Sequence, residues 1–129
     1  MTEIVLVDTN VLVDFERGNR RAGEHLDEIE SRSKPAISAM TQMEMIVGCR
    51  KKSDLSILLS FLQRFEVIPI NPAITTRTID ILLQYGLSHG VLIADALIAA
   101  TALTIQAPLL TANQRDFRFI GGLSLLPYP

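Results

Sequence analysis

The segment Ile4-Val5-Leu6-Val7-Asp8-Thr9-Asn10-Val11-Leu12 decides the fold class of this chain. Its first four residues form a continuous apolar run, which is typical of a strand buried on both faces of a parallel sheet. A carboxylate follows at once, and residues 11–16 then predict a short helix that ends near Gly18. The segment therefore predicts a strand-to-helix unit with an acidic residue at the junction.

The same alternation of strand and helix patterns continues along the rest of the chain. Further strands are predicted over residues 35–38, 66–70 and 109–111, with an edge strand at 123–126. Further helices are predicted over residues 21–31, 41–49, 53–63, 71–84 and 91–104. The helix over residues 41–49 is expected to begin with a capping box from Thr41 to Glu44, and the helix over residues 53–63 with a cap at Ser53. The helix over residues 71–84 is expected to begin at Asn71-Pro72 and to stop at Gly86. This order predicts an α/β fold of three layers, α/β/α, with a mainly parallel sheet of four or five strands.

Length and composition indicate one domain over residues 1–129 with a substantial core. A hydrophobic fraction of 48% suggests that both sheet faces are covered, or that some apolar surface is kept for a partner. No apolar run reaches the roughly 18 residues of a membrane span, and the N-terminus lacks the features of a signal peptide. A lone Cys49 excludes an intrachain disulfide, so a reducing, cytoplasmic location is expected.

Four carboxylates fall where the predicted strands and helices converge. Asp8 directly follows the first strand, and Glu44 lies in the first turn of the helix after the second strand. Asp95 lies near the start of the helix over residues 91–104, and Asp116 lies in the loop after the fourth strand. Because ligands of open α/β sheets sit beyond the carboxyl ends of the strands, we expect all four side chains near one edge.

Grouping carboxylates is unfavourable, because two unit charges about 4 Å apart repel by roughly 4 kcal/mol at an effective dielectric of 20. A hard divalent cation offsets this repulsion and takes oxygen ligands, which predicts Mg²⁺ or Mn²⁺. Zinc is disfavoured, because its usual ligands are scarce and His25 and His89 form no ligand pair. Such ions activate water for attack on a phosphodiester, so the pattern is typical of a nuclease.

Each carboxylate also has a purely structural interpretation. Asp8 could cap the helix that follows it, Glu44 could complete the capping box with Thr41, and Asp116 lies in ordinary turn chemistry. Asp95 is harder to explain in this way. It is the one charge in the ten residues 91–100, and a carboxylate on an apolar helix is unfavourable unless it is paired or bound to metal.

Four pieces of sequence together resemble the PIN domain, and more closely the VapC-type toxins of prokaryotic toxin–antitoxin pairs. They are Val7-Asp8-Thr9-Asn10-Val11-Leu12, Glu44 beside an apolar helix, Ile93-Ala94-Asp95-Ala96-Leu97-Ile98-Ala99-Ala100, and Leu110-Thr111-Ala112-Asn113 with Asp116-Phe117. Each piece alone is weak, whereas the ordered set at these spacings is specific.

This resemblance implies a ribonuclease that depends on Mg²⁺ or Mn²⁺, forms a homodimer and is blocked by an antitoxin. By position it assigns metal binding and catalysis to Asp8, Glu44, Asp95 and Asp116. It also assigns the orientation of carboxylates or waters to Thr9, Asn10, Thr111 and Asn113.

Two alternatives remain open at this stage. A phosphatase of the haloacid dehalogenase type also places an Asp after its first strand, but it requires Asp-x-Asp, and Asn10 occupies the second position here. The other alternative is a non-catalytic metal- or RNA-binding module, in which the acidic residues hold a structural ion or cap helices.

Two further expectations concern binding partners. The net charge of −2 means that RNA must be held by local basic groups, and the candidates are Arg17, Arg20, Arg21, Arg50, Lys51 and Lys52. The helix over residues 53–63 has apolar side chains around more than one face. It is therefore expected to line a dimer contact or an antitoxin groove.

Overall fold

The computed structural model describes residues 3–128, so residues 1, 2 and 129 of the predicted domain lie outside it. The strands are β1 (Glu3–Val7), β2 (Ser33–Ser38), β3 (Glu66–Ile68), β4 (Leu109–Thr111) and β5 (Leu125–Pro127). The helices are α1 (Thr9–Glu16), α2 (Arg20–Arg32), α3 (Ala39–Val47), α4 (Lys52–Leu62), α5 (Pro72–His89), α6 (Ile93–Ile105) and the 3-10 helix η1 (Gln114–Asp116).

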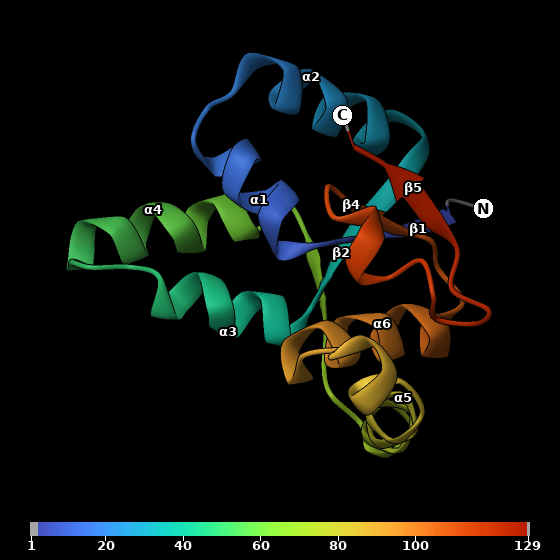
Figure 1. Cartoon of the computed structure of the whole chain (residues 1–129). Coiled ribbons are helices and arrows are strands. Elements are labelled where there is room, and N and C mark those ends of the chain that lie inside the picture. The colour runs from blue at the N-terminus through green and yellow to red at the C-terminus, as the bar shows by residue number, and fades with distance from the viewer. Residues whose placement is uncertain (1–2, 129) are drawn as a thin grey trace.

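The strands form one five-stranded, fully parallel sheet in the order β3-β2-β1-β4-β5. The central position of β1 explains its continuous apolar run, since successive side chains point to opposite faces. Val5 and Val7 join the core beneath α1, α2 and α4, whereas Leu6 joins the core beneath α5 and α6. Helices therefore cover both faces, as Figure 1 shows, and the predicted α/β/α fold is confirmed.

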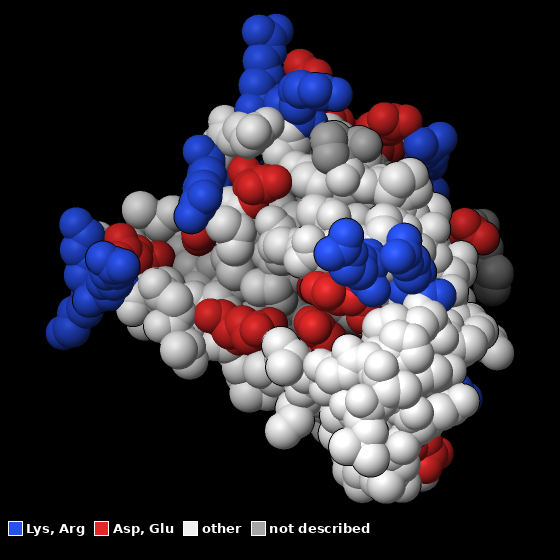
Figure 2. All heavy atoms as spheres, viewed as in Figure 1, with Lys and Arg blue, Asp and Glu red and all other residues white. Residues whose placement is uncertain are grey.

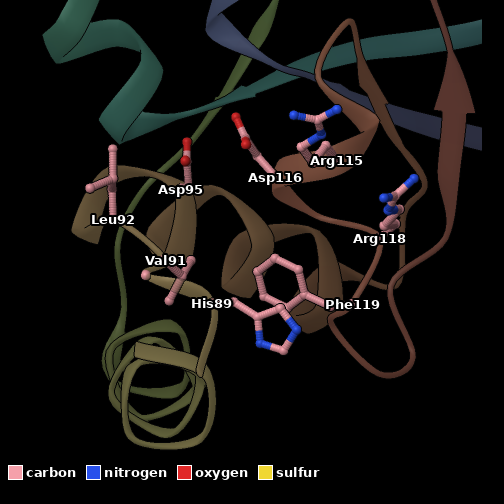
Figure 3. Close-up of a pocket in the computed structure, with 9 residues that line it drawn as sticks. His89, Val91, Leu92, Asp95, Arg115, Asp116, Arg118 and Phe119 are labelled. Atoms are coloured by element: carbon pink, nitrogen blue, oxygen red, sulfur yellow. The ribbon is translucent and has the colours of Figure 1, made fainter. Parts of the chain in front are cut away.

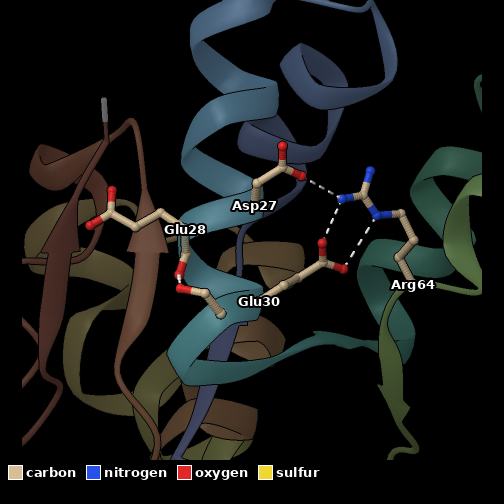
Figure 4. Close-up of polar contacts among 5 residues, drawn as sticks. Asp27, Glu28, Glu30 and Arg64 are labelled. Carbon is tan, nitrogen blue, oxygen red and sulfur yellow. Dashed lines mark hydrogen bonds and ion pairs between the residues drawn. The ribbon is translucent and has the colours of Figure 1, made fainter.

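An ion-pair network ties the end of α4 to α2 on one side of the sheet. The Arg64 guanidinium donates to Asp27 at 3.2 Å and to both carboxylate oxygens of Glu30 (Figure 4). These interactions raise the pKa of Arg64, chiefly through the hydrogen bonds to Glu30. Because the groups are exposed, the network orients the two elements and adds little to stability.

Several predicted element ends were wrong, and local chemistry explains the differences. Helix α3 begins directly after β2, where the Ser38 hydroxyl accepts from the N–H of Met40 at 3.0 Å. The predicted capping box at Thr41 is therefore absent, and Glu44 lies in the second turn. Helix α4 is capped at Lys51 without a side-chain hydrogen bond, so Ser53 lies inside it.

Other boundaries differ by two to five residues. Strand β3 ends at Ile68 rather than at residue 70, and β5 is shifted to Leu125–Pro127. Helix α5 continues through Gly86 and ends at Gly90, which adopts the left-handed conformation with φ 64°. Gly86 can remain helical because its small size weakens a helix without breaking it. No helix within residues 3–128 is long and apolar enough to cross a lipid bilayer.

The two glycines of α5 provide a test of where this helix ends. A Cβ added at either position meets no atom within 4 Å, so only backbone preference distinguishes them. Gly86→Ala should raise the free energy of unfolding by about 0.5–1 kcal/mol, because alanine favours the helix interior. Gly90→Ala should lower it by about 1 kcal/mol, because the left-handed conformation is strained for alanine. Chemical denaturation measures both, and the opposite ordering would mean that the helix ends at Gly86.

Candidate active site

Asp8 occupies the centre of the site, at the junction between β1 and α1. Its side chain is only 5% exposed, and both carboxylate oxygens are held. One accepts from the backbone N–H of Thr9 at 2.8 Å, and the other accepts from the hydroxyl of Thr111 at 2.8 Å. Asp8 is thus the N-cap of α1, as the structural interpretation expected, and it also points one oxygen toward β4.

Thr9 connects Asp8 to the second carboxylate. The Thr9 hydroxyl donates to Glu44 at 2.8 Å and shares a hydrogen bond with the buried hydroxyl of Thr41 at 3.0 Å. Thr41, which the sequence indicated only as a helix cap, therefore braces this contact between α1 and α3. The interaction fixes the half-buried Glu44 relative to Asp8, although 35 residues separate Thr9 from Glu44.

Asp95 lies in the first turn of α6 and is half-buried. Its pKa is raised to about 6, chiefly by burial and then by the charges of Asp8, Asp116 and Glu44 in that order. Burial also raises the pKa of Asp8, against the opposing effect of its hydrogen bonds from Thr111 and Thr9. The four predicted carboxylates therefore lie close enough to repel one another, from four different elements.

Asp116 is the most exposed of the four and lies in η1, after β4. Gln114 anchors this short helix by donating to the backbone carbonyls of Thr111 at 3.3 Å and Leu126 at 3.2 Å. Figure 3 shows the carboxylates of Asp95 and Asp116 on the same side of one pocket. The space-filling view likewise shows a group of acidic side chains gathered at the middle of this face (Figure 2).

The four predicted supporting residues have different environments. Thr9 and Thr111 hold carboxylates as described, and the backbone N–H of Asn113 donates to the Thr111 hydroxyl at 3.0 Å. The Oδ1 atom of Asn10 is buried without a hydrogen-bond partner among residues 3–128. An unpaired buried amide oxygen is unfavourable, and a water bound to a cation could satisfy it.

The donor chemistry of the site fits a hard divalent cation. All four groups are carboxylates, their mutual repulsion is evident in Asp95, and an acceptor at Asn10 is free. Within residues 3–128, however, no three Asp, Glu, His or Cys side chains are already gathered as a metal cage. The ligands would have to move closer together to hold a metal ion, and Asp116 is exposed while Glu44 is half-buried.

Sequence reasoning missed three residues of this edge. His89, Arg115 and Arg118 line the same pocket as Asp95 and Asp116, and Figure 3 shows them around its rim. The sequence indicated His89 only as one of two histidines that form no ligand pair. Arg115 and Arg118 flank Asp116 in the sequence, so their proximity to an acidic candidate was the available sign.

The predicted basic residues lie in several separate places and do not form one group. Arg17 lines a groove with Thr9 and Glu44, whereas Arg50 and Lys51 lie in the turn between α3 and α4. Figure 2 shows a basic cluster at the tip of that helix pair, away from the acidic group. Arg20 lies on α2 and pairs with Glu24 at 3.3 Å. Of the predicted set, Arg17 thus lines a groove together with a candidate carboxylate.

Comparison with known proteins shows the family to which the chain belongs. The PIN domain family model matches residues 5–123, so the chain belongs to the PIN domain family. Within that family its relatives include several VapC ribonucleases. It is 34% identical to ribonuclease VapC19 of Mycobacterium tuberculosis, over 87% of this chain and 90% of the relative. It is 32% identical to ribonuclease VapC1 of Methanocaldococcus jannaschii, over 96% of this chain and 86% of the relative.

A solved structure gives the same result for the fold. The chain superposes on a chain of VapBC2 from Rickettsia felis, bound to a DNA fragment from its promoter, with a TM-score of 0.85. The sequence identity is 27%, and the match covers 98% of this chain and 99% of the other. Because the chain belongs to the PIN domain family, the haloacid dehalogenase alternative is excluded. The resemblance seen in the sequence is confirmed.

The raised pKa of Asp95 predicts a pH-dependent stability without metal. Because the folded pKa of about 6 exceeds the ordinary 3.8, ionisation destabilises the folded state, and stability is lost as pH rises through this window. In EDTA, Asp95→Asn should therefore gain stability over the wild type between pH 4.5 and 7.5. For a half-exposed group we expect about 1 kcal/mol, after allowing for solvent screening.

Thermal unfolding at both pH values measures this difference. Asp80→Asn, which removes an exposed carboxylate from α5, is the matched control. An Asp95→Asn variant whose advantage is the same at both pH values would contradict the electrostatic description of the site.

Proposed function

We propose that this protein is a divalent-metal-dependent endoribonuclease and the toxin of a toxin–antitoxin pair. The observation that carries the proposal is the meeting of Asp8, Glu44, Asp95 and Asp116 at the carboxyl edge of a PIN domain sheet. The VapC ribonucleases among its relatives support RNA as the substrate, and the VapBC complex among its structural neighbours supports an antitoxin as the partner. We place its action in the cytoplasm.

Asp8, Glu44, Asp95 and Asp116 would hold Mg²⁺ or Mn²⁺. When bound, such an ion supplies an activated water for in-line attack on the phosphodiester and neutralises the charge that develops there. The chain's own contribution is to keep the carboxylates in position. Thr111 and the Thr9 N–H fix the plane of the Asp8 carboxylate, and the Thr9 hydroxyl fixes Glu44 relative to it. The two carboxylates would therefore be held in position before a metal ion binds.

RNA would approach this edge through local positive charge, because the whole chain has a net charge of −2. We propose Arg17 as an RNA contact, because it lines the same groove as Glu44. Arg50, Lys51 and Lys52 would contact a longer RNA at the tip of α3 and α4. Because these residues lie away from the acidic group, we expect them to contribute to RNA affinity and not to the chemical step.

Substitution of the metal-binding carboxylates tests the enzymatic proposal. Asp8→Asn and Asp95→Asn should each lower RNA cleavage in Mg²⁺ or Mn²⁺ by about 100-fold or more, because each removes a negative ligand at nearly constant volume. Both variants should remain folded. The measurement is cleavage of end-labelled RNA, with circular dichroism to check the fold and Asp80→Asn as the control.

The result also separates the enzyme from a non-catalytic module. Wild-type protein that binds RNA or metal but cleaves no RNA would favour the binding module. Full activity in both Asp8→Asn and Asp95→Asn at saturating metal would mean that these carboxylates are structural.

We further propose that the protein is a homodimer, and the structure offers two exposed apolar faces for partners. On α4, Ile57 and Leu59 are exposed while Leu58 and Leu62 are buried, so part of that helix is free as expected. A larger face, which the sequence did not indicate, comprises Ile79, Leu83, Leu87, Leu92 and Ile93 on α5 and the start of α6. Figure 2 shows this region as a broad uncharged surface.

We assign the dimer contact to the larger face and the antitoxin to the side of α4. Leu83→Glu should therefore yield monomers, because it places a charge where 79% of an apolar side chain is exposed. Leu59→Glu, at a 46% exposed position, should leave the dimer intact. Sedimentation velocity at micromolar concentration measures both. Dissociation by Leu59→Glu alone would exchange the two assignments, and a monomeric wild type would remove the dimer.

A further inference from the structure

A pocket of about 490 Å³ opens beside the acidic group, and its walls combine three kinds of chemistry. Asp95 and Asp116 supply carboxylates, Arg115 and Arg118 supply positive charge, and His89 with Phe119 supplies aromatic surface. Figure 3 shows the two aromatic rings on the opposite side of the pocket from the carboxylates. Metal binding accounts for the carboxylates alone, so the other two features need a separate explanation.

The aromatic wall is a stacked pair held in place by a third ring. The His89 and Phe119 rings lie nearly parallel, with centroids 4.1 Å apart and an interplanar angle of 14°. Tyr85 packs edge-on against both rings, and its hydroxyl accepts from the backbone N–H of Gly121 at 3.2 Å. His89 itself is exposed, whereas Phe119 and Tyr85 are half-buried. The pair is therefore a rigid platform whose outer ring remains accessible.

Arg115 and Arg118, like His89, are accessible to a ligand. Within residues 3–128, neither Arg115 nor Arg118 forms a salt bridge, and both are exposed. By contrast, Arg20, Arg32 and Arg64 each pair with a carboxylate. Unpaired guanidinium groups at the rim of an acidic pocket are suited to a phosphate, which they can bind with two parallel hydrogen bonds.

We propose that His89, Phe119 and Arg118 form a subsite for the nucleotide next to the cleaved phosphodiester, with its base stacked on His89 and its phosphate bound by Arg118. The proposal rests on the ribonuclease function above and specifies how that site holds single-stranded RNA. Aromatic rings bind unpaired bases of any sequence by stacking, and arginine adds attraction for the backbone. A base paired in a duplex has no free face, so the subsite selects unpaired segments.

The competing explanation is that His89 only braces the end of α5 against the loop after η1. Base stacking and bracing differ in what they require of the RNA. We therefore compare two probes by fluorescence anisotropy in the Asp8→Asn background, which removes cleavage. One is a single-stranded 12-nucleotide oligoadenylate, and the other is an abasic ribose-phosphate chain of the same length.

His89→Ala should weaken oligoadenylate binding about five-fold or more and leave the abasic chain unaffected, because only the first probe has bases to stack. His89→Phe should restore binding, since phenylalanine keeps the ring. Arg118→Gln should weaken both probes. The matched control is His25→Ala, because His25 also packs against an aromatic ring, with its centroid 5.3 Å from that of Tyr128, but lies on α2.

Three results would overturn the subsite. They are unchanged oligoadenylate binding in His89→Ala, an equal loss for both probes in that variant, and failure of His89→Phe to restore binding. In each case wild-type cleavage of RNA would leave the proposed function standing. If the wild type cleaves no RNA and Asp8→Asn does not bind oligoadenylate, the proposed function fails and the subsite fails with it.

Discussion

The pairing of β1 with β4 is the constraint on which the rest of the site depends. These strands are parallel, with Val7 opposite Leu110, and this register brings the Asp8 carboxylate to the Thr111 hydroxyl at 2.8 Å. Two segments 103 residues apart are joined at that point, and α1 begins from the same residue. A shift of the register by one residue would leave the Asp8 and Thr111 side chains on opposite faces of the sheet, because alternate residues of a strand face opposite sides. The carboxylate cluster therefore requires this strand alignment before any other contact.

The site is maintained against its own electrostatics. Four carboxylates meet where burial and mutual repulsion raise the pKa of Asp95 to about 6. The core that compensates lies on both faces of the sheet and is formed by fully buried residues such as Leu6, Leu12 and Ile98. Burial of such side chains contributes about 1.5–3 kcal/mol each, relative to leaving them exposed. The core can therefore compensate for the local destabilisation by the carboxylates. Functional sites commonly retain such a destabilisation because the ligand relieves it.

The surface divides into regions of different chemistry. The carboxyl edge carries the acidic group together with the aromatic and basic walls of the pocket, which suits a metal ion and a polyanion. The exposed leucines of α5 and the start of α6 suit an apolar contact with another protein. Leu92 belongs to both regions, since it is exposed and also lines the pocket of Asp95. A partner on the apolar face would consequently lie next to the entrance of the active site.

The sequence by itself determined the α/β class, the parallel sheet and the family, and it indicated the four acidic candidates, because these depend on local periodicity and on ordered short motifs. Helix ends were less predictable. Thr41 reads locally as a cap and Gly86 as a stop, yet the Ser38 side chain caps α3, and the left-handed Gly90 ends α5. Only the tertiary structure brought His89 on α5 against Phe119, and both beside Asp95 and Asp116. Contacts between residues this far apart depend on how the helices and loops dock, and no periodicity within the chain records that docking.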